Sequence, residues 1–142
     1  MTMLKKILAP TDFSKLSGAG VRYACHLAKE VGAQVIVMNV IALDETNMVA
    51  KGEIDAHKAR LAEFVAKTAP HHGADLKLRE VVVAGQPYNA IIDCAENEHA
   101  DLVVMSSHGR TGLSRMLIGS VTDRLLRAAK CPVLVVPSDG QN

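Results

Sequence analysis

Short apolar segments alternate along this chain with longer segments in which apolar residues recur at helical spacing. The apolar segments, such as 35–40 and 133–136, show no regular polar alternation, which is typical of parallel strands buried on both faces. Five such strands separated by four helices give the order βαβαβαβαβ, and right-handed crossovers then place helices on both faces of the sheet. The sequence therefore predicts an α/β fold with one doubly wound, five-stranded parallel sheet, and its 142 residues suit a single domain, 1–142.

Proline and glycine residues set the expected bounds of these elements. Pro10 closes the first strand, Gly32 stands where a left-handed residue ends the first helix, and Pro87 stands at the first position of a later helix. We expect strands at 3–10, 35–40, 76–84, 101–105 and 131–136, and helices at 17–31, 54–68, 87–95 and 120–129. Doubly wound sheets bind ligands beyond the carboxyl ends of their strands, so a site is expected in the loops that follow the strands.

Composition narrows the class of partner. Sixteen Lys and Arg against fifteen Asp and Glu give a net charge of +1, and there are two Tyr, two Phe and no Trp. A chain without a basic surplus or aromatic platforms is not expected to bind nucleic acid. No apolar run reaches the ~18 residues of a membrane span, and the N-terminal segment lacks the core of a secretion signal. Cys25, Cys94 and Cys131 are odd in number and lack CxxC spacing, so we expect reduced thiols in a cytoplasmic protein.

The connection after the fourth strand, 106–120, is much longer than the roughly two to six residues usual between a strand and a helix. Gly109 and Gly112 permit close approach of the backbone to a ligand, and Gly119 precedes a helix start whose N–H groups favour an anion. These features indicate a phosphate cradle. Hydroxyl donors and positive charge come from Ser106, Ser107, Thr111, Ser120, Thr122, Arg110 and Arg115.

A plain loop is the alternative for this connection. Ser120 and Asp123 fit an S-x-x-D capping box, which would begin the last helix without any ligand. The connection also matches neither a Walker A sequence nor the GxGxxG dinucleotide pattern.

Several short motifs are spread along the chain. They are ILAPTDFS at 7–14, GQP at 85–87, SHGR at 107–110, GSVT at 119–122 and CPVLVV at 131–136. With these motifs, essentially the whole chain resembles the universal stress protein family. The nucleotide-binding branch of that family carries Gly-x-x-Gly, nine residues and Gly-Ser/Thr, and Gly109 followed after nine residues by Gly119 and Ser120 matches it. Ser106 stands where that pattern has its first glycine, so we expect binding to be weakened there but not abolished.

The resemblance implies the strand order 3-2-1-4-5, which brings the ends of the first and fourth strands together where the order reverses. It implies a cleft there for an adenine nucleotide, ATP or AMP, with Mg²⁺ accompanying the phosphates. Pro10 and Val40 would line the adenine slot, and Asp12 would accept a hydrogen bond from the ribose or base. The residues carried over are Pro10, Thr11, Asp12, Val40, Ser106, Ser107, His108, Gly109, Arg110, Thr111, Gly112, Gly119, Ser120, Val121 and Thr122. The alternatives are a helix cap for Asp12 and simple strand termination for Pro10 and Val40.

The resemblance further implies a homodimer in which the edge strand 131–136 pairs across a two-fold axis. The alternative is an edge covered by the chain's own helices. The implied role is that of a stress-response regulator that acts through its nucleotide state.

Two other function classes stay open. A slow ATP hydrolase or autophosphorylating protein could use the hydroxyl-rich loop, with His108 as base or acceptor. However, no acidic pair and no lysine stand near His108 in the loop, which favours binding without fast turnover. An interaction module that binds no nucleotide is the third class, and Ser106 is its hint. His71 and His72 fit a solvated helix C-terminus better than a metal site.

Overall fold

A computed structural model describes residues 4–69, 76–107 and 119–137 of the chain. Five parallel strands form one sheet in the order β3-β2-β1-β4-β5. The predicted fold class and strand order are confirmed, and most bounds differ from the expected ones by one or two residues. The elements are β1 (Lys6–Pro10), α1 (Gly18–Val31), β2 (Gln34–Ala42), α2 (Glu53–Thr68), β3 (Lys77–Gly85), α3 (Pro87–Asn97), β4 (Leu102–Ser106), α4 (Ser120–Ala128) and β5 (Val133–Val136).

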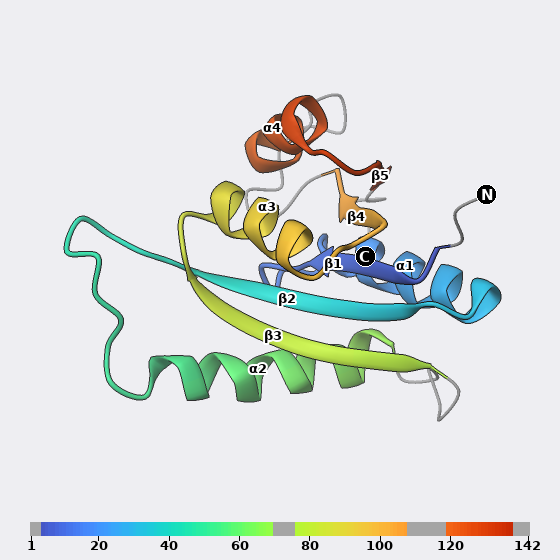
Figure 1. The fold of residues 1–142 in the computed structure, drawn as a ribbon. Coiled ribbons are helices and arrows are strands. Elements are labelled where there is room, and N and C mark those ends of the chain that lie inside the picture. The colour runs from blue at the N-terminus through green and yellow to red at the C-terminus, as the bar shows by residue number, and fades with distance from the viewer. Residues whose placement is uncertain (1–3, 70–75, 108–118, 138–142) are drawn as a thin grey trace.

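Helices cover both faces of the sheet, α1 and α2 on one face and α3 and α4 on the other. In Figure 1, α2 lies below the long β2 and β3 ribbons and α3 lies above them. Ile7 and Val37 pack toward α1 and α2, whereas their neighbours Leu8 and Ile36 pack toward α3 and α4. Successive residues of a strand point to opposite faces, so a sheet covered on both faces needs apolar residues at every position. This explains the lack of alternation in these strands.

The strands pair over very different lengths. β2 and β3 pair along their whole nine-residue lengths, and β1 pairs with β2 from Lys6 to Pro10. By contrast, β1 pairs with β4 at Ile7–Leu102 and Leu8–Val103. The sheet therefore has a strongly paired β1-β2-β3 half, to which β4 and β5 are joined by a short pairing.

Three predicted helix ends are confirmed, at Gly32, Pro87 and Ser120, whereas the alternative of a capping box is wrong. Gly32 ends α1 with φ of 76°, and Pro87 begins α3 after Gln86, whose side chain accepts a hydrogen bond from Asn89 N. The capping box of the last helix is not formed: the N-cap of α4 is Gly119, so Ser120 is already the first helical residue. Asp123 consequently lies beyond the third helical position and instead pairs with Arg127 at 3.3 Å.

The cysteines and the edge strand also match expectation. The three cysteines are free, and burial raises the pKa of the Cys25 thiol to about 11. β5 forms one edge of the sheet. Within the described ranges, none of the helices combines the length and the apolar character needed to cross a bilayer. His71 and His72 lie outside the described residues.

Candidate functional site

A cavity of about 320 Å³ lies at the carboxyl ends of β1, β2 and β4, where the strand order reverses between β1 and β4. This is the position at which doubly wound sheets bind ligands. The walls come from these strand ends, from the start of α1 and from the first turns of α3 and α4. The lining residues are Pro10, Thr11, Asp12, Ser17, Met38, Val40, Ala42, Pro87, Ile91, Met105, Ser106, Gly119, Ser120, Val121 and Thr122.

The backbone that leaves β1 is held from several sides. Thr11 N donates to Met38 O at 2.8 Å, and Asn39 Nδ2 donates to Thr11 O at 3.0 Å. The Thr11 hydroxyl accepts from Phe13 N at 3.0 Å and lies 2.7 Å from Ser17 Oγ. Phe13 has φ of 69°, a left-handed conformation that is uncommon for a bulky residue. The chain thus makes a tightly bonded turn at the edge of the cavity.

Asp12 lies in this turn. Its Oδ1 accepts from Ser14 N at 3.0 Å, whereas the N-cap residue of α1 is Ser17. The alternative that Asp12 caps the first helix is therefore wrong. Among the lining residues that the structure describes, Asp12 is the ionisable one. A carboxylate can only accept hydrogen bonds, so Asp12 suits ligand hydroxyl or amine groups and not an anion.

Ser106 joins three elements at the end of β4. Its Oγ accepts from Gly20 N at 2.8 Å and donates to Ser17 O at 3.1 Å. Its carbonyl oxygen accepts from Thr122 Oγ1 at 3.2 Å. The start of α1, the end of β4 and the first turn of α4 therefore meet at this one residue.

Backbone bonds hold the start of α4 beside the end of β4. Ser107 N donates to Val136 O at 2.9 Å, and Gly119 N donates to Ser107 O at 2.8 Å. The N–H groups of a first helical turn have no acceptor within the helix and carry the positive end of its dipole. Because Ser120, Val121 and Thr122 line the cavity, this end of α4 gives the cavity an anion-favouring wall.

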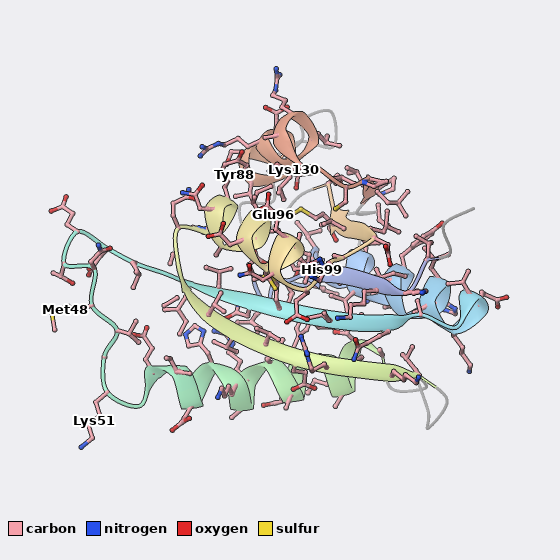
Figure 2. The ribbon with its side chains drawn as sticks, viewed as in Figure 1. Met48, Lys51, Tyr88, Glu96, His99 and Lys130 are labelled. Carbon is pink, nitrogen blue, oxygen red and sulfur yellow. The ribbon has the colours of Figure 1, made fainter. Side chains whose placement is uncertain are left out.

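Two side-chain contacts join α3 to α4 and to the residues that follow α4. The guanidinium of Arg124 lies 4.1 Å from the centre of the Tyr88 ring, close to the first turns of both helices. Lys130, which follows α4, has its Nζ 3.3 Å from Glu96 Oε1 of α3, and Figure 2 labels Tyr88, Glu96 and Lys130. The Arg124–Tyr88 contact links α4 directly to α3, which forms part of the cavity wall.

Nine of the fifteen residues predicted for the site line this cavity: Pro10, Thr11, Asp12, Val40, Ser106, Gly119, Ser120, Val121 and Thr122. Ser107 adjoins the cavity through its backbone bonds but is not part of the lining. The other five, His108, Gly109, Arg110, Thr111 and Gly112, lie outside the described residues.

Six lining residues were not predicted: Ser17, Met38, Ala42, Pro87, Ile91 and Met105. A strand that is apolar throughout does not reveal which of its side chains faces a cavity, so Met38 and Met105 carried no signal. Pro87 did carry one, because the segment 85–87 was expected to follow the carboxyl end of the third strand.

The lining combines two kinds of surface. Met38, Val40, Ile91, Met105 and Val121 provide apolar surface, which can bury a flat ring. Hydroxyl groups, the first turn of α4 and one carboxylate provide the polar surface. No group of three His, Cys, Asp or Glu side chains suited to a metal ion occurs among the described residues. The cavity is thus suited to a ligand with an apolar ring, hydrogen-bond donors and an anionic end.

Comparison with known proteins gives the family. Residues 3–137 match the universal stress protein family. Universal stress protein MJ0531 of Methanocaldococcus jannaschii is 37% identical, over 94% of this chain and 82% of that relative. The chain belongs to the universal stress protein family. The resemblance inferred from the sequence motifs is therefore confirmed.

Solved structures have the same fold as this universal stress protein. The structure of MJ0577, also from M. jannaschii, is 33% identical with a TM-score of 0.67, over 96% of this chain and 97% of that one. A universal stress protein in complex with cAMP is 27% identical with a TM-score of 0.73, over 97% of this chain and 100% of that one.

Proposed function

We propose that this universal stress protein binds an adenine nucleotide, ATP or AMP, in the cavity between the ends of β1 and β4. The observation that carries the proposal is the meeting of an apolar wall, one carboxylate and the start of α4 around a single cavity. The similar protein in complex with cAMP supports an adenine nucleotide as the ligand class. In this proposal the nucleotide is a signal in a cytoplasmic stress-response regulator, and fast turnover is not its role.

Each part of a nucleotide has a matching part of the cavity. The adenine would lie against Pro10 and Val40, which add apolar surface at the ends of β1 and β2. A ribose hydroxyl would donate to the Asp12 carboxylate. The phosphates would accept from the first-turn N–H groups of α4 and from the exposed Ser120 hydroxyl.

Thr122 offers one donor to the phosphates, and the described lining residues offer few ligands to Mg²⁺ in this arrangement. The Thr122 hydroxyl donates to Ser106 O, so the backbone N–H is the donor that Thr122 offers to a phosphate. Mg²⁺ would bind chiefly to phosphate oxygens and water, because Asp12 is the one carboxylate among the described lining residues.

Calorimetric titration with ATP, ADP, AMP, cAMP and GTP, with and without Mg²⁺, tests the proposal on protein freed of co-purified nucleotide. We expect adenine-selective binding, and for Asp12→Asn a loss of about tenfold in affinity, because a hydrogen bond to a charged acceptor is weakened. Asp55→Asn is the matched control, since Asp55 is exposed on α2 and does not line the cavity. Folded, empty protein that binds none of these nucleotides would refute the proposal and favour an interaction module.

Turnover is tested on the same protein with labelled ATP. We expect the nucleotide to be recovered unchanged and the protein to stay unlabelled over many binding lifetimes. Release of phosphate, or label on the loop 106–120, would instead identify slow hydrolysis or autophosphorylation.

We further propose a homodimer that pairs β5 of two copies. Val103 N donates to Pro132 O and Ser107 N donates to Val136 O, so residues 132, 134 and 136 bond to β4. In a parallel ladder this leaves the N–H groups of Val133 and Val135 directed to the open edge. Val135→Pro removes one outward donor and keeps the bonds to β4, so it should convert a dimer into a folded monomer. Sedimentation measures the oligomeric state and circular dichroism measures whether the variant is folded. An unchanged dimer would refute this interface.

A further inference from the structure

The buried polar side chains of the described residues form one connected set. They are Thr11, Ser17, Asn39, Ser106 and Thr122, each at most 6% exposed. Asn39 bonds to the Thr11 carbonyl, the Thr11 and Ser17 hydroxyls lie 2.7 Å apart, Ser106 bonds to Ser17 O, and Thr122 bonds to Ser106 O. All but Asn39 line the cavity. Buried polar networks are stabilising when every member is satisfied, and here the bonds connect the cavity walls to one another.

Ser106 supplies the capping acceptor that the N-cap residue of α1 does not provide. Gly20 is the third residue of α1, and its N–H is one that an N-cap side chain normally satisfies. Ser17, the N-cap residue, makes no such bond, because its hydroxyl donates to Ser14 O and contacts Thr11 Oγ1. The acceptor for Gly20 N is instead Ser106 Oγ, from the other half of the chain. Ser106 therefore caps α1 from β4.

The missing side chain of Gly20 makes this contact possible. A Cβ on Gly20 would lie 2.9 Å from Ser106 N, 3.0 Å from Met105 C and 3.1 Å from Ser106 Oγ. The 2.9 Å contact to the Ser106 backbone nitrogen would force α1 away from β4, so any larger residue at position 20 would break the cap. The absence of a side chain at Gly20 thus leaves the space in which the Ser106 hydroxyl bonds to Gly20 N.

We propose that Ser106 is a positioning residue for the nucleotide site, acting through α1 and α4. Its hydroxyl caps α1 and its carbonyl holds Thr122, so the spacing between Asp12, β4 and the start of α4 is fixed before a ligand arrives. A serine in place of the family's glycine then supports the site, in contrast to the weakening expected from the sequence alone. For its effect on a ligand, this inference rests on the proposed function.

Ser106→Ala and Ser106→Gly test the proposal, with Val65→Ala as the matched control. Val65 is buried on α2 and does not line the cavity, so its truncation lowers stability without touching the cap. In both Ser106 variants we expect amide exchange of Gly20 to rise about three- to tenfold and the Tm to fall by several degrees. We also expect nucleotide Kd to rise about three- to tenfold, whereas Val65→Ala lowers Tm with Kd unchanged.

Three results would overturn the proposal. Tighter nucleotide binding by Ser106→Gly would mean that serine obstructs the site. Unchanged Gly20 exchange in both variants would mean that the hydroxyl is not a cap. A Kd increase in Val65→Ala as large as in Ser106→Ala would mean that Ser106 affects binding only through the overall stability of the fold.

Failure of the proposed function can be distinguished from failure of the cap. If the wild-type protein binds no nucleotide, the proposed function and the role of Ser106 in positioning a nucleotide fall together. Gly20 exchange and Tm need no ligand, so they still decide whether Ser106 caps α1.

Discussion

The face of the sheet covered by α1 and α2 and the face covered by α3 and α4 share their strands but carry unequal cores. Among the described residues, the α1/α2 face holds a cluster of fifteen buried residues, whereas the α3/α4 face holds seven, with eleven partly buried residues around them. Met38, Ile91 and Met105 of the second cluster line the cavity, and none of the fifteen in the first cluster does. Within the described part of the chain, the α1/α2 face therefore has the larger buried core.

This difference separates stability from binding. Hydrophobic stabilisation follows the apolar area removed from water, so most of it is expected from the α1/α2 face. On the α3/α4 face, the cavity at the carboxyl ends of the strands replaces part of the packed core, and a ligand can occupy this cavity. Truncations in the α1/α2 core should therefore lower stability alone, whereas truncations in the α3/α4 core should lower both stability and nucleotide affinity.

Leu61→Ala should cause the largest loss of stability. Leu61 is 1% exposed within the α1/α2 core, and a truncated buried leucine costs about 3 kcal/mol. Because Leu61 does not line the cavity, nucleotide affinity of the folded variant should equal that of the wild type. Urea unfolding and calorimetry measure the two quantities.

Leu125→Ala is the matched substitution on the other face. Leu125 is 0% exposed on α4, the helix whose first turn lines the cavity. We expect a similar loss of stability, and in addition a rise in nucleotide Kd of several fold. If both variants kept the same affinity, the two faces would not divide the tasks as described.

Gly119→Asp should have the next largest effect, and on binding alone. Its φ of −61° and ψ of 153° are open to any residue, so the backbone should accept the change. If the phosphates lie where we propose, a carboxylate beside them should lower affinity by about thirtyfold or more, roughly 2 kcal/mol. Gly119→Asn controls for size, and equal losses from Asp and Asn would argue against an anion at this position.

Asn39→Leu addresses the residue that links α2 to the turn after β1. Asn39 Nδ2 donates to Thr11 O, and its Oδ1 lies 2.9 Å from His57 Nδ1 on α2. The leucine leaves the buried Thr11 carbonyl without this donor, which should cost about 1–3 kcal/mol and raise nucleotide Kd about threefold. His57→Ala removes the outer bond alone, so it should change Kd less; the reverse order would contradict this account.

Asp101→Asn should have the smallest effect, and none on binding. Asp101 lies at the amino ends of the strands, and its Oδ2 accepts from Lys5 N at 2.9 Å and Lys6 N at 3.0 Å. These N–H donors hold the pKa of the carboxyl below its ordinary value. The charged form therefore stabilises the fold above about pH 4, and this contribution is lost as the pH falls further. Thermal unfolding should show a small deficit of the variant at pH 7 that disappears in acid.

Local signals account for what could be predicted from the sequence. Continuous apolar runs indicate buried strands, as in β2 and β5. The backbone preferences of glycine and proline mark helix ends, as at Gly32 after α1 and Pro87 at the start of α3. The lining of the cavity was predictable where the family motifs mark it, as at Asp12 and Gly119.

Contacts between distant segments account for what could not be predicted. The hydroxyl of Ser106 bonds to Gly20, and nothing near either residue in the sequence indicates this pairing. Ile91 faces the cavity for a similar reason, since its apolar neighbours on α3 are equally suited to the core. The capping-box alternative for Ser120 and Asp123 arose because a capping box and a helix that starts one residue earlier have nearly the same sequence.

The short pairing of β1 with β4 has a consequence for the order of folding during synthesis. Once residue 85 has been made, β1, β2 and β3 can pair and α1 and α2 can cover their shared face. Until α3 and α4 follow, Leu8, Ile36 and Met38 would remain open to water on the other face. We expect the nascent chain to need a chaperone most at this stage, and the cavity to be the last feature of the protein to form.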